Sequence, residues 1–262
     1  MPWRPTGPDR PGSLSPALPR PTMQSAAVRP LNFLLWVSSA MAAHSPQRAL
    51  SRYSDSMTIP LIDLAGQYAS IREEIAEALD ALISSQRFIL GPEVEALEAD
   101  LASYVGVRHA IGVASGTDAL LLSLKALDAD PGSAVVVPSF TFFASAGAVW
   151  NAGFRPVFCD VDPDTFNVTP ETLEAAWTDR TVAVVVVHLF GQMADMVPIR
   201  ALAHSRGAFV LEDAAQAIGA RSCSGSAGSV GDAGAFSFFP TKNLGGFGDG
   251  GLVTTQVSAF AD

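Results

Sequence analysis

Two runs of valine constrain the fold of this 262-residue chain more than any other feature. They are Val135–Val137 and Val182–Val187, the second interrupted only by Ala183. A strand with one face in water alternates apolar and polar residues, whereas neither run contains a polar residue. Strands of this kind are buried on both faces, which is typical of a mostly parallel sheet covered by helices. The sequence therefore predicts an α/β fold.

The segments around the valine runs alternate between strand and helix patterns from residue 67 onward. Two helices are expected first, over 68–83 and 92–104, the second opening with proline in its first turn. Further helices are expected from 117 and over 144–151, 170–177 and 199–204, and strands over 109–113, 134–137, 155–159, 182–187, 208–211 and 235–239. Parallel sheets bind ligands at the carboxyl ends of their strands, so we expect functional residues directly after the strands.

The first 56 residues differ in composition from the remainder of the chain. They contain nine prolines and six arginines and lack a periodic apolar pattern. The apolar stretch over 31–43 is similar to that of a signal peptide, but it is too short to span a bilayer and begins unusually late. We expect residues 1–56 to be a disordered or wrongly assigned extension, and the folded domain to occupy 57–262 from Met57 onward.

Charge and cysteine content argue against a nucleic-acid-binding protein and against a cysteine metal site. The net charge is −10 although six of the 16 basic residues lie in the first 56, so the remainder is strongly acidic. A nucleic-acid surface would need a basic patch instead. Cys159 and Cys223 lie far apart without metal-ligand spacing, which is typical of reduced thiols. We expect a cytoplasmic protein that has no nucleic-acid, membrane or metal partner and in which neither cysteine has a role.

The chain has only two lysines, and their surroundings differ. Lys125 lies in a leucine-rich helical segment, where its stem covers apolar surface and its ammonium reaches water. Lys242 follows the apolar strand over 235–239 and precedes a glycine-rich segment over 243–251. A lysine beside an apolar wall loses its proton more easily and forms a Schiff base with a carbonyl. The alternative that these residues leave open is a turn-rich hairpin whose lysine is solvated.

Other segments that follow expected strands carry polar or aromatic residues. Ser115–Thr117 opens a helix whose free amides suit a phosphate, although ordinary helix capping explains these residues equally well. The rings of Phe140–Phe143 pack in a core or stack on a planar cofactor. Glu212 and Asp213 directly follow a buried strand, where a carboxylate is costly unless it meets a cation such as a protonated pyridine. We expect His188 to be a hydrogen-bonded structural histidine.

Five motifs in order resemble those of the pyridoxal-phosphate-dependent sugar aminotransferases of the DegT/StrS type, from about Ile59 to the last residue. The motifs are Ala114-Ser115-Gly116-Thr117-Asp118-Ala119-Leu120, Pro138-Ser139-Phe140-Thr141-Phe142, His188-Leu189-Phe190-Gly191-Gln192, Glu212-Asp213-Ala214-Ala215-Gln216 and Phe236-Ser237-Phe238-Phe239-Pro240-Thr241-Lys242-Asn243-Leu244-Gly245. The resemblance implies a three-layer α/β fold with a mixed, mostly parallel seven-stranded sheet of the aspartate-aminotransferase type. We expect this chain to be the large domain alone, without the small C-terminal domain of the family.

The same resemblance implies roles for seven residues around pyridoxal 5'-phosphate. Lys242 would be catalytic, forming the Schiff base and moving a proton between substrate and cofactor. Asp213 would pair with the pyridinium nitrogen, which keeps the ring an electron sink. The remaining cofactor-binding residues would be Gly116, Thr117 and Ser237 at the phosphate, Phe142 on the ring face and Gln216 at the phenolic oxygen.

The implied reaction is a transfer of an amino group from glutamate or glutamine to a keto-sugar. The acceptor would be a nucleotide-linked 3- or 4-keto-6-deoxyhexose, used in amino-sugar, polysaccharide or secondary-metabolite biosynthesis, and the enzyme a homodimer. The related sugar dehydratases carry histidine where this chain has Lys242, so the lysine favours amino transfer. Two alternatives remain: a non-catalytic cofactor-binding or regulatory fragment, and another Schiff-base enzyme of the same fold, such as a sugar dehydratase.

Overall fold

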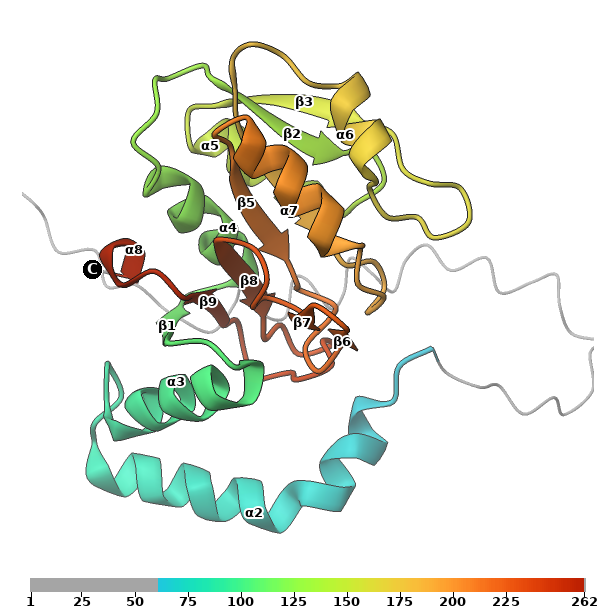
Figure 1. The fold of residues 1–262 in the computed structure, drawn as a ribbon. Coiled ribbons are helices and arrows are strands. Elements are labelled where there is room, and N and C mark those ends of the chain that lie inside the picture. Colours follow the sequence, from blue (N-terminus) through green and yellow to red (C-terminus); the bar gives the residue numbers. More distant parts are fainter. Residues whose placement is uncertain (1–60, 262) are drawn as a thin grey trace, which may run out of the picture. The chain divides into compact units, whose positions relative to one another are not determined.

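The computed structural model describes residues 61–261, which form a seven-stranded sheet with helices on both faces (Figure 1). The expectations for residues 1–56 lie outside the described residues. The strands of the sheet are β1 (His109–Val113), β2 (Ala134–Pro138), β3 (Arg155–Cys159), β4 (Thr181–Val187), β5 (Phe209–Asp213), β8 (Ala233–Ser237) and β9 (Gly251–Thr255). Their spatial order is β1-β9-β8-β5-β4-β2-β3, so β5 lies at the centre of the sheet.

The sheet is mixed, and a single strand makes it so. β9 pairs antiparallel with β1 and with β8, whereas the pairs β2–β3, β2–β4, β4–β5 and β5–β8 are all parallel. The expected mostly parallel, seven-stranded sheet is therefore confirmed. β9 was not among the expected strands, because it begins at the last glycine of the glycine-rich segment; only the hairpin alternative for Lys242 implied a strand there. A separate two-stranded ribbon, β6 (Arg221–Ser222) and β7 (Gly225–Ser226), was also not expected.

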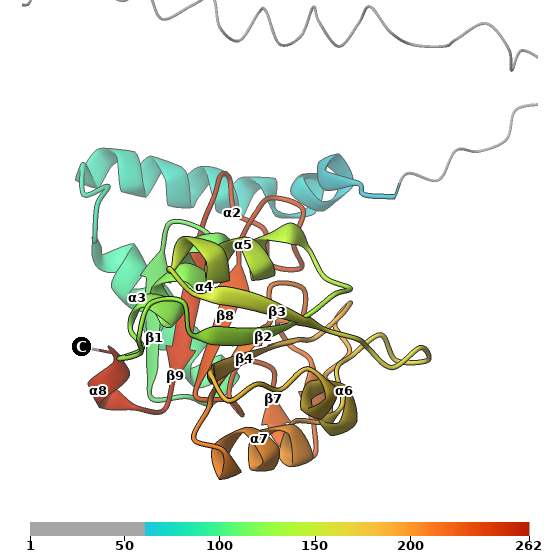
Figure 2. The ribbon, with the colours of Figure 1, turned by 90° about the horizontal axis from the view of Figure 1, so that it is seen from above.

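The valine runs pack against helices on both sides, as their lack of polar residues predicts. The helices of the two layers are α4 (Gly116–Lys125) and α5 (Phe143–Asn151) on one face, and α6 (Pro170–Ala175) and α7 (Met196–Ser205) on the other (Figure 2). Successive side chains of a strand point to opposite faces. Val185 therefore packs with α4 and α5, while its neighbours Val184 and Val186 pack with α6 and α7.

Several element boundaries differ from the sequence expectation, and two of the differences concern strands that end at the same edge of the sheet. β5 continues through Glu212 and Asp213, so both carboxylates belong to the central strand rather than to the loop after it. β8 ends at Ser237, two residues before the expected end. α6 ends at Ala175 because its last turn tightens, with the amide of Trp177 bonded to the carbonyl of Glu174. The other expected helices and strands are present.

Two further helices precede the sheet in sequence, and a short helix follows it. α3 (Pro92–Val105) buries Leu101 and Val105 in a cluster with Phe236 and Leu252. α2 (Leu64–Ser85) begins with Asp63 as its N-cap and has no buried residue along its 22 positions. The chain ends with α8 (Ser258–Ala261). Within 61–261, none of the helices is both long enough and apolar enough to cross a bilayer.

Candidate functional site

One cavity of about 550 Å³ lies beyond the carboxyl ends of the parallel strands. Ser237, Asp213 and Val187 end the strands that reach it. All seven residues that the resemblance singles out line this cavity: Gly116, Thr117, Phe142, Asp213, Gln216, Ser237 and Lys242. A second cavity of about 460 Å³ opens at the other end of the strands, beside Phe209, and none of the seven lines it. The structure thus brings residues up to 126 positions apart in sequence around a single cavity.

The N-terminal end of α4 forms one wall of the cavity together with the end of β8. The Ser115 hydroxyl caps the helix by accepting from the amide of Asp118 at 3.1 Å. A Cβ at Gly116 would lie 2.6 Å from Cβ of Ser237, so only glycine lets the helix and the strand approach this closely. Because the first amides of a helix have no intrahelical partner, this wall offers hydrogen-bond donors to an anion.

Asp118 does not compete with such an anion. Its carboxylate accepts from the Ser115 hydroxyl at 2.9 Å, and its side chain is not part of the cavity lining. The donor set at this wall consists of helix amides and the hydroxyls of Thr117 and Ser237. Neutral donors at a helix N-terminus suit a phosphate group.

Asp213 lies at the floor of the cavity and is almost completely buried, with 6% of its surface exposed. Ser145 in the first turn of α5 donates its hydroxyl to Oδ2 of Asp213 at 2.7 Å, and the amide of Ala215 donates to Oδ1 at 3.2 Å. Burial raises the pKa of Asp213, and these two hydrogen bonds and the nearby Lys242 oppose the rise only in part. A cation at the open side of this carboxylate would therefore be stabilised.

Lys242 lies in the loop that joins β8 to β9, with its side chain at the cavity. Partial burial lowers the pKa of its amine, while the charge of Asp213 opposes that shift. The hairpin that the sequence analysis kept as an alternative is present, but its lysine is half-buried rather than fully solvated. Gly245 is required in this loop, because a Cβ there would overlap the carbonyl of Pro240. The amine has an environment that favours the neutral, nucleophilic form.

Phe142 and Gln216 complete the lining. Phe142 occupies the N-cap position of α5, and 75% of its surface is exposed. Gln216 follows β5 and lies beside Gly191, whose φ of +87° and close approach to the Gln216 carbonyl favour glycine. Both side chains border the cavity. An aromatic ring at its mouth and an amide along its wall suit a flat, polar ligand.

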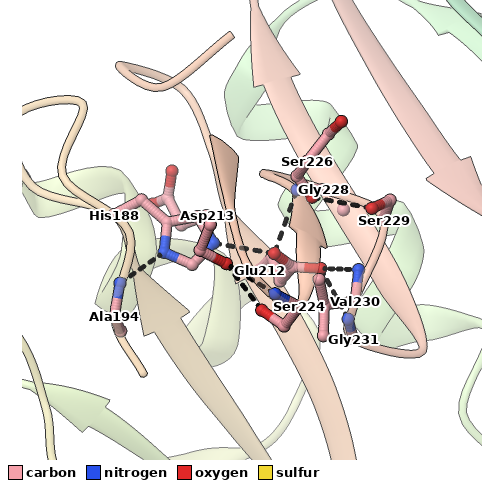
Figure 3. A network of polar contacts seen from close by, with 12 residues as sticks. His188, Ala194, Glu212, Asp213, Ser224, Ser226, Gly228, Ser229, Val230 and Gly231 are labelled. Carbon is pink, nitrogen blue, oxygen red and sulfur yellow. Dashed lines mark hydrogen bonds and ion pairs between the residues drawn. The ribbon is translucent and has the colours of Figure 1, made fainter. Parts of the chain in front are cut away.

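A fully buried carboxylate, Glu212, lies behind this floor on the other face of β5 (Figure 3). Its four donors are the backbone amides of Gly228 at 2.9 Å, Val230 at 2.7 Å and Gly231 at 2.5 Å, and Nε2 of His188 at 2.7 Å. Nδ1 of His188 accepts from the amide of Ala194 at 3.2 Å, so the ring hydrogen sits on Nε2 and is donated to Glu212. His188 is hydrogen-bonded, as expected, and it also lines the cavity.

Sequence reasoning missed three side chains at this site. The buried network of Glu212 could not be anticipated, because its partners lie between 16 and 24 positions away. Ser145 and Thr141 were not singled out either, although Thr141 stands inside one of the quoted motifs. The two cysteines lie apart from the cavity lining, and burial raises the pKa of the Cys159 thiol to about 12. Within the described residues, no cluster of histidines, cysteines and carboxylates is arranged to hold a metal ion.

Comparison with known proteins places the chain in a family. The profile of the DegT/DnrJ/EryC1/StrS aminotransferase family matches residues 69–262. The chain belongs to this family. The DegT/StrS resemblance and the type of fold are therefore both confirmed, and the sheet and cavity described above are those of a family member.

The chain is also similar to individual members of the DegT/DnrJ/EryC1/StrS family. A UDP-N-acetyl-3-dehydro-alpha-D-glucosamine 3-aminotransferase of Acidithiobacillus ferrooxidans is 50% identical over 202 residues, which is 77% of this chain and 55% of the relative. A pleiotropic regulatory protein of Geobacillus stearothermophilus is 48% identical over 206 residues, 79% of this chain and 55% of the relative. The crystal structure of S. venezuelae DesV in complex with a ketimine intermediate matches with a TM-score of 0.76 at 44% identity, covering 79% of this chain and 56% of DesV. The chain thus spans about half the length of these relatives.

Replacing Glu212 by glutamine is expected to destabilise the protein. The amide NH₂ of glutamine cannot accept from the backbone amides that Glu212 now serves, so at least one buried donor would face another donor. We expect the free energy of unfolding to fall by about 3 kcal/mol. Denaturant unfolding measures this loss of stability. Glu174→Gln is the matched control, since Glu174 forms an exposed ion pair with Arg206. Equal, small effects in both variants would contradict the network.

The pKa of Asp213 predicts a pH dependence of stability. Because its folded pKa is raised above the ordinary 3.8, the folded state holds the proton more tightly, so this contribution is present at low pH and lost as pH rises through the folded pKa. Asp213→Asn does not titrate. In the protein without cofactor, the stability of the variant relative to wild type should therefore increase as pH rises above 3.8.

Denaturant unfolding across this pH range measures that difference. Asp162 is the matched control, because hydrogen bonds from Thr165 lower its pKa. The contribution of Asp162 is present above its ordinary pKa and lost as pH falls, so Asp162→Asn must give a trend of opposite sign. A pH-independent difference between wild type and Asp213→Asn would show that this carboxyl is not perturbed.

Proposed function

We propose that this chain is the cofactor-binding part of a pyridoxal-phosphate-dependent aminotransferase. The amino donor is glutamate or glutamine, and the acceptor is a nucleotide-linked 3- or 4-keto-6-deoxyhexose in amino-sugar or polysaccharide biosynthesis. Family membership supports the reaction class, and the relative from A. ferrooxidans is named for a UDP-linked 3-dehydro sugar. Because the chain spans about half the length of these relatives, its own activity and substrates are part of the proposal.

A single observation carries the proposal: three different chemical requirements of one cofactor meet in one cavity. Helix amides and hydroxyls near Gly116 suit the phosphate. The buried carboxylate of Asp213 suits a pyridinium nitrogen, and the half-buried Lys242 suits the aldehyde carbon. Each element alone has an ordinary structural explanation, whereas their convergence on one cavity of about 550 Å³ does not.

Pyridoxal phosphate, when bound, supplies an electron sink that stabilises negative charge at the substrate carbon. The protein's own residues would bind and orient the cofactor and move the proton. Asp213 would hold the ring nitrogen protonated, because an anion at that position favours the positive form. Lys242 would hold the cofactor through its amine and would move a proton at the reacting carbon. Phe142 and Gln216 both line the cavity. Phe142 would cover the face of the ring, and Gln216 would donate to its phenolic oxygen.

The alternatives differ in what the cavity residues do after binding. A sugar dehydratase of this fold carries histidine at the position of Lys242, so the lysine supports amino transfer. A regulatory protein would bind the cofactor without turnover. The similarity to the pleiotropic regulatory protein of G. stearothermophilus is the observation that favours this alternative. A half-reaction with an amino donor separates these functions.

We also propose that the active assembly is a homodimer built on α2. This helix exposes Ile71, Leu79 and Ile83 by between 38% and 55% and buries none of its residues. The apolar segment Phe88–Leu90 follows it, also exposed. An amphipathic helix of this length gains most of its stability from packing. Within residues 61–261 this face makes one aromatic contact, between Tyr68 and Phe247, and buries none of its side chains, so we infer that a second copy covers it.

Absorbance spectroscopy tests the cofactor site. With pyridoxal phosphate, the full chain should show a visible band that glutamate or glutamine bleaches, because the amine of Lys242 is poised to attack the aldehyde. Lys242→Ala should show neither the band nor the bleaching. Lys125→Ala is the matched control, since Lys125 is exposed on α4 and should leave both unchanged. A band that persists in Lys242→Ala would contradict the proposal, and a band that no amino donor bleaches would favour the regulatory alternative.

Sedimentation analysis tests the assembly. The full chain should sediment as a dimer, and Ile83→Glu should shift it to monomer because a charge would be buried in the interface. Leu122→Glu is the control, as Leu122 is 50% exposed on α4 rather than on α2. Monomeric wild-type protein at all concentrations would contradict the proposed homodimer.

A further inference from the structure

Two hydroxyls connect the loop after β2 to the carboxylate at the floor of the cavity. Thr141 lines the cavity, and its Oγ1 lies 2.9 Å from Oγ of Ser145. Ser145 is fully buried in the first turn of α5, and its Oγ lies 2.7 Å from Oδ2 of Asp213. Thr141, Ser145 and Asp213 therefore form an unbroken chain across 72 positions of sequence, which we call the hydroxyl chain.

The direction of the hydroxyl chain follows from its chemistry. An ionised carboxylate only accepts hydrogen bonds, so Ser145 must spend its one hydroxyl hydrogen on Asp213. The oxygen of Ser145 can then only accept from Thr141, which makes Thr141 the donor. Hydroxyls linked in one direction polarise one another and strengthen the final bond to the charge. A proton on Oδ2 of Asp213 would need Ser145 as its acceptor, which would reverse the direction of the chain.

Few groups near Asp213 stabilise its ionised form. The titratable side chains that face it are His188 from the end of β4 and Lys242 from the loop after β8, while Glu212 beside it bonds on the opposite face of the sheet. α5 contributes no titratable residue, but its N-terminal end carries partial positive charge, which also favours an anion. Burial works against that anion. Two protein hydrogen bonds oppose burial directly, and Ser145 supplies the shorter one.

We propose that Thr141 and Ser145 orient the Asp213 carboxylate and keep it ionised toward the cavity, so that Ser145 is a positioning residue for the ring nitrogen of the cofactor. This inference rests on the proposed function, in which Asp213 meets that nitrogen. One oxygen of Asp213 is tied to α5 and the other to the amide of Ala215, which fixes the plane of the carboxylate. Phe142, the ring-stacking candidate, directly follows Thr141, so one short segment sets both contacts.

A purely structural role for Ser145 makes a different prediction. If its hydroxyl only joined α5 to β5, its loss would lower stability without changing the ionisation of Asp213. If it holds the charge, its loss must move the titration of Asp213 to higher pH, because the anion loses a donor that the neutral acid does not need. The titration of this one carboxyl therefore separates the two roles.

Carbon-13 NMR of the full chain, labelled at aspartate carboxyls and free of cofactor, gives that titration. The Asp213 signal is the one that disappears in Asp213→Asn. Ser145→Ala should move its midpoint upward, and Thr141→Val should move it upward by less, because it removes only the second hydroxyl. Thr141→Ser retains the hydroxyl and should titrate like wild type.

Ser123→Ala is the matched control for the loss of a buried serine hydroxyl. Ser123 is 1% exposed in α4, and within 61–261 its hydroxyl has no hydrogen-bond partner. It should leave the Asp213 titration unchanged. An unchanged midpoint in Ser145→Ala would overturn the proposal. Should Ser145→Ala fail to fold, Thr141→Val and Thr141→Ser decide the question, since Thr141 is only partly buried.

A second readout uses the protein loaded with pyridoxal phosphate. In Ser145→Ala the half-reaction with the amino donor should be about tenfold slower near neutral pH, the size expected for losing one hydrogen bond to a charged group. Raising the pH should restore part of this rate, because it favours ionised Asp213 without restoring the hydrogen bond that orients the carboxylate. A rate equal to that of wild type at every pH would contradict the proposal. The NMR titration needs no cofactor, so it stands even if wild-type protein forms no visible band, a result that would refute the proposed function instead.

Discussion

The fold of this protein depends on burying two neighbouring carboxylates at the end of its central strand. Glu212 and Asp213 point to opposite faces of β5, because successive side chains of a strand alternate. An isolated buried carboxylate costs several kcal/mol, so each must be surrounded by donors. Much of the chain around the cavity is arranged to supply them.

The two carboxylates meet this requirement in different ways. Glu212 accepts from His188 and three backbone amides of the segment before β8, which ties that segment and the end of β4 to the central strand. Asp213 has two hydrogen-bond donors among residues 61–261 and faces the cavity. The fully satisfied carboxylate stabilises the scaffold, and the incompletely satisfied one leaves room for a ligand cation. Because Glu212 and Asp213 are neighbours on β5, the hydrogen bonds of Glu212 also hold the backbone of Asp213 in place.

The α/β class could be predicted from the sequence for physical reasons that can be named, whereas the set of seven cavity residues came from the family resemblance and their roles stay predictions. Valine runs without polar residues require burial on both faces, and the end of a parallel strand is where ligand contacts gather. Asp213 and Lys242 were recognisable because a carboxylate after a buried strand and a lysine after an apolar one need an explanation. β9 was not recognisable, since its five residues gain strand structure only by pairing with β1 and β8. The partners of Glu212 and Ser145 were hidden because those contacts join distant segments, which neither periodicity nor spacing reveals.

The central claim is that Lys242 is the covalent anchor of pyridoxal phosphate. Borohydride reduction of the loaded full chain, followed by peptide mass spectrometry, tests it directly, since the chain offers only two lysines. The account predicts a single pyridoxyl group on the peptide that contains Lys242 and none on the peptide that contains Lys125. Modification of Lys125 in place of Lys242, or of both to the same extent, would contradict it.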